Sequence, residues 1–245
     1  MVIVNWSPEA QGLVRALAQV APASPGDEPP VVCVGTESAD EVESAMAGTS
    51  AGSLLRYVQA PGLSEGVDPL ARVLRRDVDI VSARSVIVLP DRFAEEPDAA
   101  SRLTCVAVTR ACSSASVPNI VVEVEDPEAA YEFAGLGVAT VFYPGYLRAA
   151  LLAHACVDLG VFQFVYGLLR GRYRVRLWPV QPQWREGTFC DVAREVEADD
   201  EGRPVTPIGL QLPASEPDDE PDLVINPGPR RSVSDAVGLL VLVDA

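Results

Sequence analysis

The sequence predicts an α/β protein: a Rossmann-like, doubly wound parallel sheet, followed by a long crossover helix and a small α+β C-terminal lobe. Three observations carry this prediction. Short runs rich in β-branched residues alternate with helical patterns over residues 1–145, residues 146–169 form one apolar stretch, and strand-like alternation follows Gly171. We therefore expect an N-terminal lobe at 1–145, a long apolar helical region at 146–170 and a C-terminal lobe at 171–245.

Six apolar runs in the N-terminal lobe are expected to be strands. They are residues 2–4, 31–34, 54–58, 85–89, 119–124 and 140–143. Helical patterns fill the intervals between them, at residues 8–20, 38–47, 67–76, 97–112 and 127–135. Apolar strands that alternate with helices in this way are typical of a parallel sheet covered on both faces.

The region after the sixth run is more apolar than a solvated helix. Leucine, valine and phenylalanine recur through residues 146–169, and the only histidine of the chain, His154, lies among them. Because most faces of such a helix must be buried, we expect it to pack between lobes or to form a subunit interface, with His154 as a packed or interface residue. We expect a kink at Gly160.

The C-terminal lobe is expected to combine a few strands with one short helix. The strands are predicted at 173–178, 205–212, 223–225 and 238–243, and the helix at 189–196. Arginines alternate at the start of the first of these strands, at positions 170, 172, 174 and 176. We expect them to guard a solvated edge strand with charge. The alternative is contact with acidic loops of a neighbouring subunit.

Composition excludes several classes of protein. The formal net charge is −16 and every one of the 19 basic residues is arginine, which excludes lysine-based catalysis. So acidic a surface repels phosphate backbones, and we expect no nucleic-acid partner. The five cysteines have no metal-site spacing and are expected to be reduced, buried thiols. No apolar run approaches the ~20 residues that span a bilayer, and the N-terminus lacks a signal-peptide pattern.

In a doubly wound sheet the ligand binds where the first strand meets the first helix. That turn reads Asn5-Trp6-Ser7, and of the usual glycine pattern only Gly12 is present. Ser7 is expected to cap the helix, Trp6 to hinder close approach of a ligand to the backbone, and Glu37, after the second strand, to bind a ribose. Two interpretations stay open: an adenine nucleotide in a modified pocket, or a nucleotide fold that has lost its nucleotide.

Several segments in the same order resemble the RCK family, the regulators of potassium conductance, and in particular its Trk-type and Castor/Pollux-like branches. The segments are Val-Ile-Val-Asn-Trp-Ser at 2–7, the fourth strand and its exit at 83–91, the fifth strand at 118–127, Gly-Leu-Gly-Val-Ala-Thr-Val-Phe-Tyr-Pro at 135–144, and the closing segments at 226–229 and 239–243. The resemblance covers nearly the whole chain. Where the family often has Gly-Asp after its third strand, this sequence has Gln59-Ala60.

The resemblance implies partners, ligands and a location. Family members pair through the crossover helix, and the dimers assemble into an octameric ring attached to a membrane-embedded potassium channel or transporter pore. The chain is then cytoplasmic, at the inner face of the membrane. NAD(H), adenine nucleotides or divalent cations such as Ca²⁺ bias such rings between states. With the exit of the fourth strand included, the expected cofactor-binding residues are Asn5, Trp6, Ser7, Gly12, Glu37 and Asp91.

Carboxylates at the end of the fifth strand are candidate cation ligands. Glu123 and Glu125 are two residues apart and so face one side of a strand, and Ca²⁺ binds several hard oxygen ligands. The resemblance adds Asp98, because some calcium-gated family members combine a similar Glu-x-Glu with an aspartate before the preceding helix. The alternative interpretation is that all three are solvated charges.

These observations favour a cytosolic, ligand-sensing regulatory domain of a potassium channel or transporter, a gating-ring subunit without catalytic activity. Two alternatives stay open. One is an NAD-dependent, oxidoreductase-like Rossmann protein, for which the sequence offers few proton-transfer residues. The other is a degenerate structural subunit that assembles but binds no ligand.

Overall fold

The structure, a computed structural model, describes residues 1–20, 31–60, 66–112, 117–214 and 222–244. The chain divides into two compact units, Met1–Ala149 and Ala150–Ala245. The boundary between the two units falls inside a helix rather than in a loop.

The first unit is built on a six-stranded sheet. Its strands are β1 (Val2–Val4), β2 (Val31–Gly35), β3 (Leu55–Gln59), β4 (Ser85–Val88), β5 (Asn119–Glu123) and β6 (Val138–Phe142). They lie in the order β3-β2-β1-β4-β5-β6, and every pairing is parallel. This is the strand order of a doubly wound Rossmann sheet, which confirms the predicted fold class.

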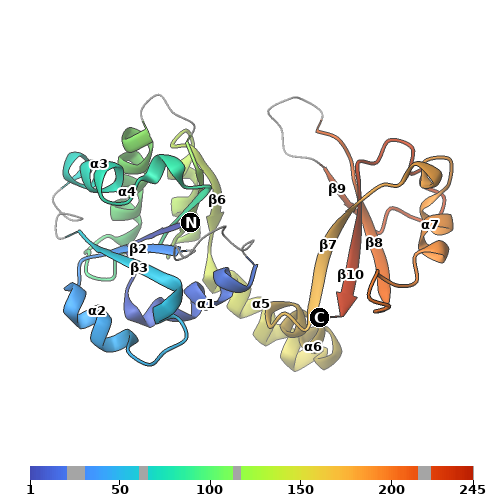
Figure 1. The fold of residues 1–245 in the computed structure, drawn as a ribbon, viewed down its shortest axis with the longest axis horizontal. Coiled ribbons are helices and arrows are strands. Elements are labelled where there is room, and N and C mark those ends of the chain that lie inside the picture. Colours follow the sequence, from blue (N-terminus) through green and yellow to red (C-terminus); the bar gives the residue numbers. More distant parts are fainter. Residues whose placement is uncertain (21–30, 61–65, 113–116, 215–221, 245) are drawn as a thin grey trace. The chain divides into compact units, whose positions relative to one another are not determined.

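Four α-helices cover the two faces of this sheet (Figure 1). They are α1 (Gln11–Val20), α2 (Ala39–Met46), α3 (Val67–Arg76) and α4 (Pro97–Cys112). Side chains alternate across a strand, and β1 follows this rule: Val2 and Val4 are buried in the core that includes α3 and α4, whereas Ile3 is buried in the core that includes α1 and α2. Both faces of the central strand are therefore dry.

Two predicted helices of this unit are tighter or shorter than expected. Pro8–Ala10 forms a 3₁₀ turn before α1 begins. The segment predicted as a helix at 127–135 is a 3₁₀ helix, Pro127–Phe133, whose first turn is capped by Asp126. Both turns begin with proline, which has no N–H to donate and is favoured in a first turn.

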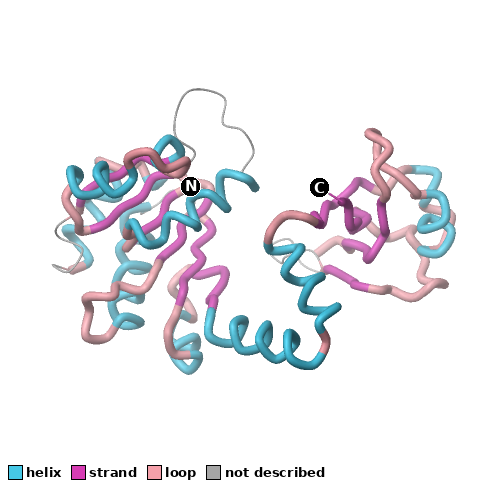
Figure 2. The backbone as a smooth tube through the Cα atoms, turned by 90° about the horizontal axis from the view of Figure 1, so that it is seen from below, coloured by secondary structure: helices cyan, strands magenta, loops and turns pink. Residues whose placement is uncertain are grey.

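Two apolar helices follow β6, and one residue separates them (Figure 2). They are α5 (Pro144–Val157) and α6 (Leu159–Leu169). The break lies at Asp158, where the backbone is extended and the carboxylate accepts a hydrogen bond from the Val161 amide at 3.1 Å. The predicted kink at Gly160 is therefore wrong. An aspartate side chain competes for the hydrogen-bond donors of the backbone and favours the start of a helix. Asp158 therefore ends α5 and begins α6.

In the second unit, α6 is followed by a four-stranded antiparallel sheet and a further short α-helix. These elements are β7 (Tyr173–Pro179), α7 (Phe189–Glu195), β8 (Val205–Gln211), β9 (Leu223–Ile225) and β10 (Gly238–Asp244). The strands lie in the order β7-β10-β8-β9, which makes β7 an edge strand, as its arginines predict. Trp184, Phe189 and Leu239 are buried in the core of this unit. The predicted α+β lobe is confirmed.

Single residues bear out part of the expectations. Cys33, Cys105 and Cys112 are buried, and burial raises the pKa of Cys33 and Cys105 to about 12. Cys156 on α5 is exposed, so the prediction of a buried thiol is wrong there. His154 is exposed on the same helix. Among the described residues, no helix combines the length and the apolar character that a membrane span requires.

Candidate functional site at the switch point of the sheet

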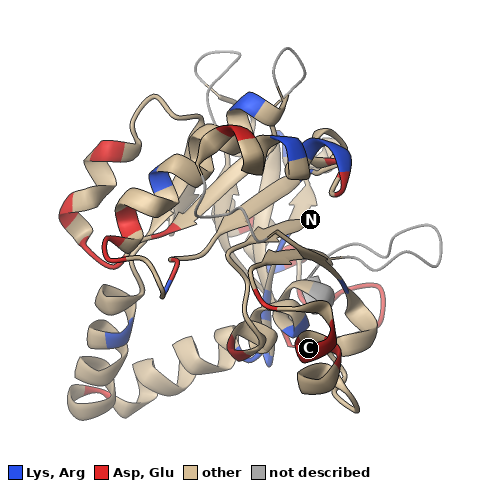
Figure 3. Ribbon diagram, turned by 90° about the vertical axis from the view of Figure 1, so that its left-hand side faces the viewer, with Lys and Arg blue, Asp and Glu red and all other residues tan. Residues whose placement is uncertain are grey.

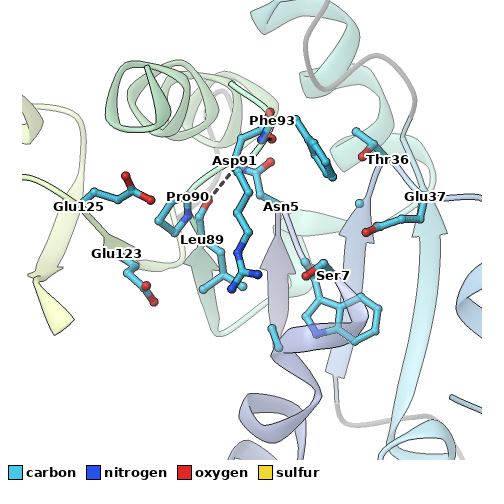
Figure 4. Close-up of a pocket in the computed structure, with 14 residues that line it drawn as sticks. Asn5, Ser7, Thr36, Glu37, Leu89, Pro90, Asp91, Phe93, Glu123 and Glu125 are labelled. Carbon is cyan, nitrogen blue, oxygen red and sulfur yellow. Dashed lines mark hydrogen bonds between the residues drawn. The ribbon is translucent and has the colours of Figure 1, made fainter. Parts of the chain in front are cut away.

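A crevice lies where the chain leaves β1 and β4, the two central strands. The connections from these strands run to opposite sides of the sheet, and ligands of doubly wound proteins bind at such a switch point. A cavity of about 200 Å³ is bordered by the carboxyl ends of β1, β2, β4 and β5. Figure 4 shows Asn5 and Asp91 near its middle, Thr36 and Glu37 on one side, and Glu123 and Glu125 on the other.

Asn5 closes the switch point. Its backbone is left-handed, with φ of 60°, a conformation that asparagine tolerates better than most residues. Its side-chain amide donates a hydrogen bond to the Leu89 carbonyl at 2.8 Å, so the ends of β1 and β4 are tied together directly. Asn5 is thus a positioning residue of the crevice, in the place where sequence analysis expected a cofactor contact.

Trp6 is a core residue with its backbone at the crevice. Its amide donates to the Val34 carbonyl at 2.9 Å, and its side chain is only 1% exposed. The indole packs against the Tyr57 ring at a centroid distance of 5.9 Å. The expectation that Trp6 hinders approach to the backbone is therefore wrong, because the ring is turned into the core.

Gly35 is the glycine of this site, and sequence analysis missed it. A Cβ at this position would lie 2.4 Å from the Trp6 carbonyl oxygen and 2.8 Å from the Tyr57 hydroxyl. Only glycine permits such a close approach of two strand ends. The signal was present, since Gly35 directly follows an apolar run. Gly12, in contrast, has open space within 4 Å of where a Cβ would lie, and it does not line the crevice.

Glu37 borders the crevice after β2, as predicted. The Tyr57 hydroxyl donates to the Glu37 carbonyl oxygen at 2.9 Å. Burial, and then the Glu37 carboxylate, raise the pKa of Tyr57 well above its usual range. The phenol therefore stays neutral and holds the β2 exit in place, with the Glu37 carboxylate close beside it.

The opposite side of the crevice is also acidic. Burial raises the pKa of Glu123, Arg92 lowers it, and the neighbouring Glu125 raises it further. Arg92 forms an ion pair with Glu9. Among the described residues of the lining, Arg92 is the single cation, and the carboxylates are those of Glu37, Asp91, Glu123 and Glu125.

The start of the first helix gives an anion little support. Ser7 precedes the 3₁₀ turn as expected, but its side chain makes no capping hydrogen bond. Pro8 provides no N–H, and Glu9 occupies the first turn. A phosphate placed there would meet a carboxylate where Rossmann proteins normally offer free amides. The electrostatics of this crevice thus favour a neutral or cationic group over a phosphate.

The three predicted metal ligands are not brought together. Glu123 and Glu125 line the crevice, but Asp98 does not. The Asp98 carboxylate accepts hydrogen bonds from the amides of Glu125 and Asp126, both at 2.9 Å, so it ties the start of α4 to the end of β5. In the part of the chain that the structure describes, no three histidine, cysteine or carboxylate side chains are arranged to hold a metal ion.

Phe93 is a second residue that sequence analysis missed. It lies after β4, is 85% exposed, and borders both the crevice and an adjoining cavity of about 440 Å³. The adjoining cavity is walled by Leu70 and Leu103 and shares Asn5 and Asp91 with the crevice. An acidic chamber and a more apolar one thus meet at an exposed aromatic ring.

Sequence comparisons and structural comparisons give different answers. No protein-family model and no curated protein sequence matches this chain. The human SLO3 gating ring matches 98% of this chain and 43% of its own, at 12% sequence identity and a TM-score of 0.62. The GsuK RCK domain matches at 16% identity (98% and 43% covered), and the GsuK channel bound to NAD at 14% (98% and 35%). Their TM-scores are 0.41 and 0.37.

The first unit is Rossmann-like and has a crevice at its switch point. Apolar helices connect it along the chain to a small antiparallel unit. Together these features define a class of two-unit α/β proteins. Within that class the chain has the RCK-domain fold, because the match to the gating ring runs through both units. The resemblance stated from the sequence is confirmed at the level of the fold. The chain spans less than half the length of the gating-ring chain that it matches.

Proposed function

We propose that this chain is a regulatory domain of a potassium channel or potassium transporter, and acts as a non-catalytic, ligand-sensing subunit of a gating ring. The observation that carries the proposal is the match of 98% of the chain to a gating ring at a TM-score of 0.62. The pore then belongs to a partner or to another part of the protein. The domain works at the cytoplasmic face of the membrane.

The surface of α5 and α6 supports self-association. No side chain of α5 is buried. Leu152 is 62% exposed and Val157 87%, and Leu159 and Leu169 are exposed as well. Exposed apolar side chains gathered on two successive helices are typical of an interaction site. We propose that two copies pair through it, and that such dimers build the ring.

The proposed dimer surface can be tested by charge insertion. We expect the wild-type chain to elute above its monomer mass and Leu152→Arg to shift it to the monomer, measured by size-exclusion chromatography with light scattering. Leu223→Arg is the matched control, because Leu223 is 56% exposed on β9, outside α5 and α6. A monomeric wild type, or equal effects of both variants, would contradict pairing through α5 and α6.

The crevice supports the sensing role, and its residues suit two ligand classes. Glu37 is placed for the ribose of an adenine nucleotide or NAD(H), whereas Glu123 and Glu125 suit a divalent cation such as Ca²⁺. Four carboxylates face one paired arginine, and this charge balance favours the cation. A ligand shifts a ring between states only if it binds one state better than the other.

Thermal melts after chelator treatment separate these classes. A ligand that binds only the folded chain stabilises it by ~2.7 kcal/mol at a hundredfold excess over its dissociation constant. We expect Ca²⁺ to raise the melting temperature of the wild type and of Glu37→Gln, but not of Glu123→Gln. The reverse pattern with NAD, NADH, ADP or ATP would establish a nucleotide site. No shift with any of them would favour the structural subunit.

The oxidoreductase alternative has less support from the site. The chain contains no lysine, and its one histidine lies on α5 rather than in the crevice. Proton transfer beside a nicotinamide would depend on the crevice carboxylates. Hydride transfer between NAD(H) and a substrate panel, monitored at the nicotinamide absorbance band, would revive this alternative.

A further inference from the structure

A second cavity, separate from the crevice, lies within the second unit. It is an open groove of about 810 Å³ between α6 and the start of β7. Its helical wall includes Gly160, Gln163 and Gly167, which are three or four residues apart and so share one face of α6. Val161, Val165 and Leu168 lie outside the lining, which leaves another face of α6 free for a partner subunit.

The floor of this groove is built by a glycine and two aromatic rings. Gly167 is the only buried residue of α6, and a Cβ there would lie 2.7 Å from the Tyr173 ring. The missing side chain lets Tyr173 pack against the helix, where it also contacts the Phe164 ring at 5.8 Å between centroids. The turn into β7 passes through Gly171, with φ of 71°.

Two arginines stand over the aromatic walls with their donors unused. The Arg170 guanidinium lies 5.6 Å from the centre of the Tyr166 ring, and the Arg172 guanidinium 5.4 Å from that of Tyr173. Such cation–π contacts orient a guanidinium without using its N–H groups. Neither side chain makes an ion pair or a hydrogen bond with any described residue. Asp244, opposite Tyr173 in the sheet, is likewise unpaired with them.

These free donors are unexpected in so acidic a chain. Acidic positions are spread over both units (Figure 3), and the formal net charge is −16. Other arginines of the chain form ion pairs, as Arg203 does with Asp199 and Arg231 with Asp235. Arg170 and Arg172 therefore form a local positive site, and no carboxylate among the described residues forms an ion pair with either of them.

We infer that this groove binds a phosphate group carried by a ligand with an aromatic or apolar part. Planar guanidinium forks match the oxygens of a phosphate and donate two hydrogen bonds each. The Gln163 amide and the Tyr166 hydroxyl add neutral donors, and the aromatic walls cover the apolar part of the ligand. A soluble phosphate ester and a phosphorylated lipid headgroup share this chemistry. The inference does not depend on the function proposed for the crevice.

The same strand supplies a matched control for charge. Arg174 and Arg176 follow within four residues but do not line the groove. They pair across the sheet with Val243 and Val241, which are buried on the core side. A double substitution at 174 and 176 removes the same charge from the same strand, and it leaves the groove intact.

The test measures binding of phenyl phosphate by titration calorimetry at low ionic strength, with phenol as the uncharged control. We expect phenyl phosphate to bind and phenol not to bind. Arg170→Gln with Arg172→Gln should weaken binding roughly tenfold or more, because both charged hydrogen-bonding groups are lost. Arg174→Gln with Arg176→Gln should change it by less than about threefold, as expected of exposed charges outside the site.

Vesicles distinguish the two sources of phosphate. Phosphatidylcholine vesicles with and without phosphatidylinositol 4-phosphate are sedimented with the same proteins. Phosphoinositide-dependent sedimentation that is lost only in the 170/172 variant assigns the site to a lipid headgroup, and phenyl phosphate binding alone assigns it to a soluble ester. Binding of neither probe, or equal losses in both double variants of unchanged melting temperature, would overturn the inference.

Discussion

The crevice of the first unit and the groove of the second are opposite in charge, although one acidic chain builds both. Carboxylates dominate the crevice, and its one arginine is already paired. The groove presents two arginines that lie over aromatic rings and form no ion pair with a described residue. The net charge of the chain thus predicts the sign of the charge in the crevice, but it predicts the wrong sign for the groove. The local charge of a site depends on whether its charged side chains have partners within the fold.

The two sites also use glycine differently. At Gly35 the close neighbour is the backbone carbonyl of Trp6, in the segment that follows β1, whereas at Gly167 it is the edge of a tyrosine ring. Backbone in the middle of a sheet cannot give way, but a ring at the surface can turn. The crevice is therefore the more rigid of the two sites, and substitutions there should have the larger effects.

The largest effect is expected for Gly35→Ala. The new Cβ would stand 2.4 Å from the Trp6 carbonyl oxygen, and relieving that overlap should lower the free energy of unfolding by about 3 kcal/mol. Urea denaturation measures the loss. Gly12→Ala is the control, because nothing lies within 4 Å of its Cβ, and it should be neutral or stabilising. Equal stability of both variants would show that the crevice yields as easily as the surface.

A smaller loss is expected for Asn5→Ala. It removes the hydrogen bond to the Leu89 carbonyl and places alanine at a positive φ, which together should cost about 2 kcal/mol. Asn5→Gly removes the same hydrogen bond but adopts the backbone freely, so its loss should be smaller. The melting temperatures of the two variants measure this difference in stability. If Asn5→Gly is less stable than Asn5→Ala, the left-handed backbone is not the reason why asparagine stabilises this position.

Gly167→Ala should change stability by less than about 1 kcal/mol. The Tyr173 ring has to move from a Cβ that would lie 2.7 Å away, but alanine favours the helix by nearly 1 kcal/mol. Gly167→Ala should also weaken the binding of phenyl phosphate to the groove, because Tyr173 forms the floor of the groove. This loss of binding should be larger than the loss of stability. A loss as large as that of Gly35→Ala would remove the contrast between the two sites.

The smallest effect concerns pH. Burial raises the pKa of Glu123 in the folded chain, so the folded state binds a proton more readily than the unfolded state. Stability therefore falls as pH rises through the interval between the unfolded and the folded pKa. Glu123→Gln should remove this penalty and stabilise the chain by a few tenths of a kcal/mol at neutral pH, since solvent screens a half-buried group. The gain should vanish below that interval, and melts at several pH values measure it. A gain that persists in acid would have another origin.

The sheet was predictable because its strands carry strong local signals. Val31–Gly35 and Asn119–Glu123 are apolar runs between helical patterns, and α4 begins and ends where its pattern does. The break at Asp158 was not predicted, because Gly160 is the stronger helix breaker by propensity alone. The aspartate prevails because its side chain satisfies an amide of the next helix.

The candidate site was predicted in position but not in composition. Asn5 and Glu37 follow strands and Glu123 ends one. Because the strand ends of a parallel sheet meet at one edge, their convergence was foreseeable. The role of Gly35 depends on Trp6 and Tyr57, which approach it only in three dimensions. Asp98 was expected to face a cation, and instead it binds two amides. The spacing of residues in the sequence does not determine which partner a carboxylate binds.

The single residue between α5 and α6 has a mechanical consequence. Glu123 of the crevice is paired with Phe142 at the end of β6, and α5 begins directly afterwards at Pro144. The boundary between the units lies inside this helix, which is about 21 Å long at 1.5 Å per residue. A helix resists bending and torsion, so α5 extends the β6 edge of the crevice as one stiff segment as far as Val157. At Asp158 the backbone is extended, and this stiff segment ends there before α6 begins.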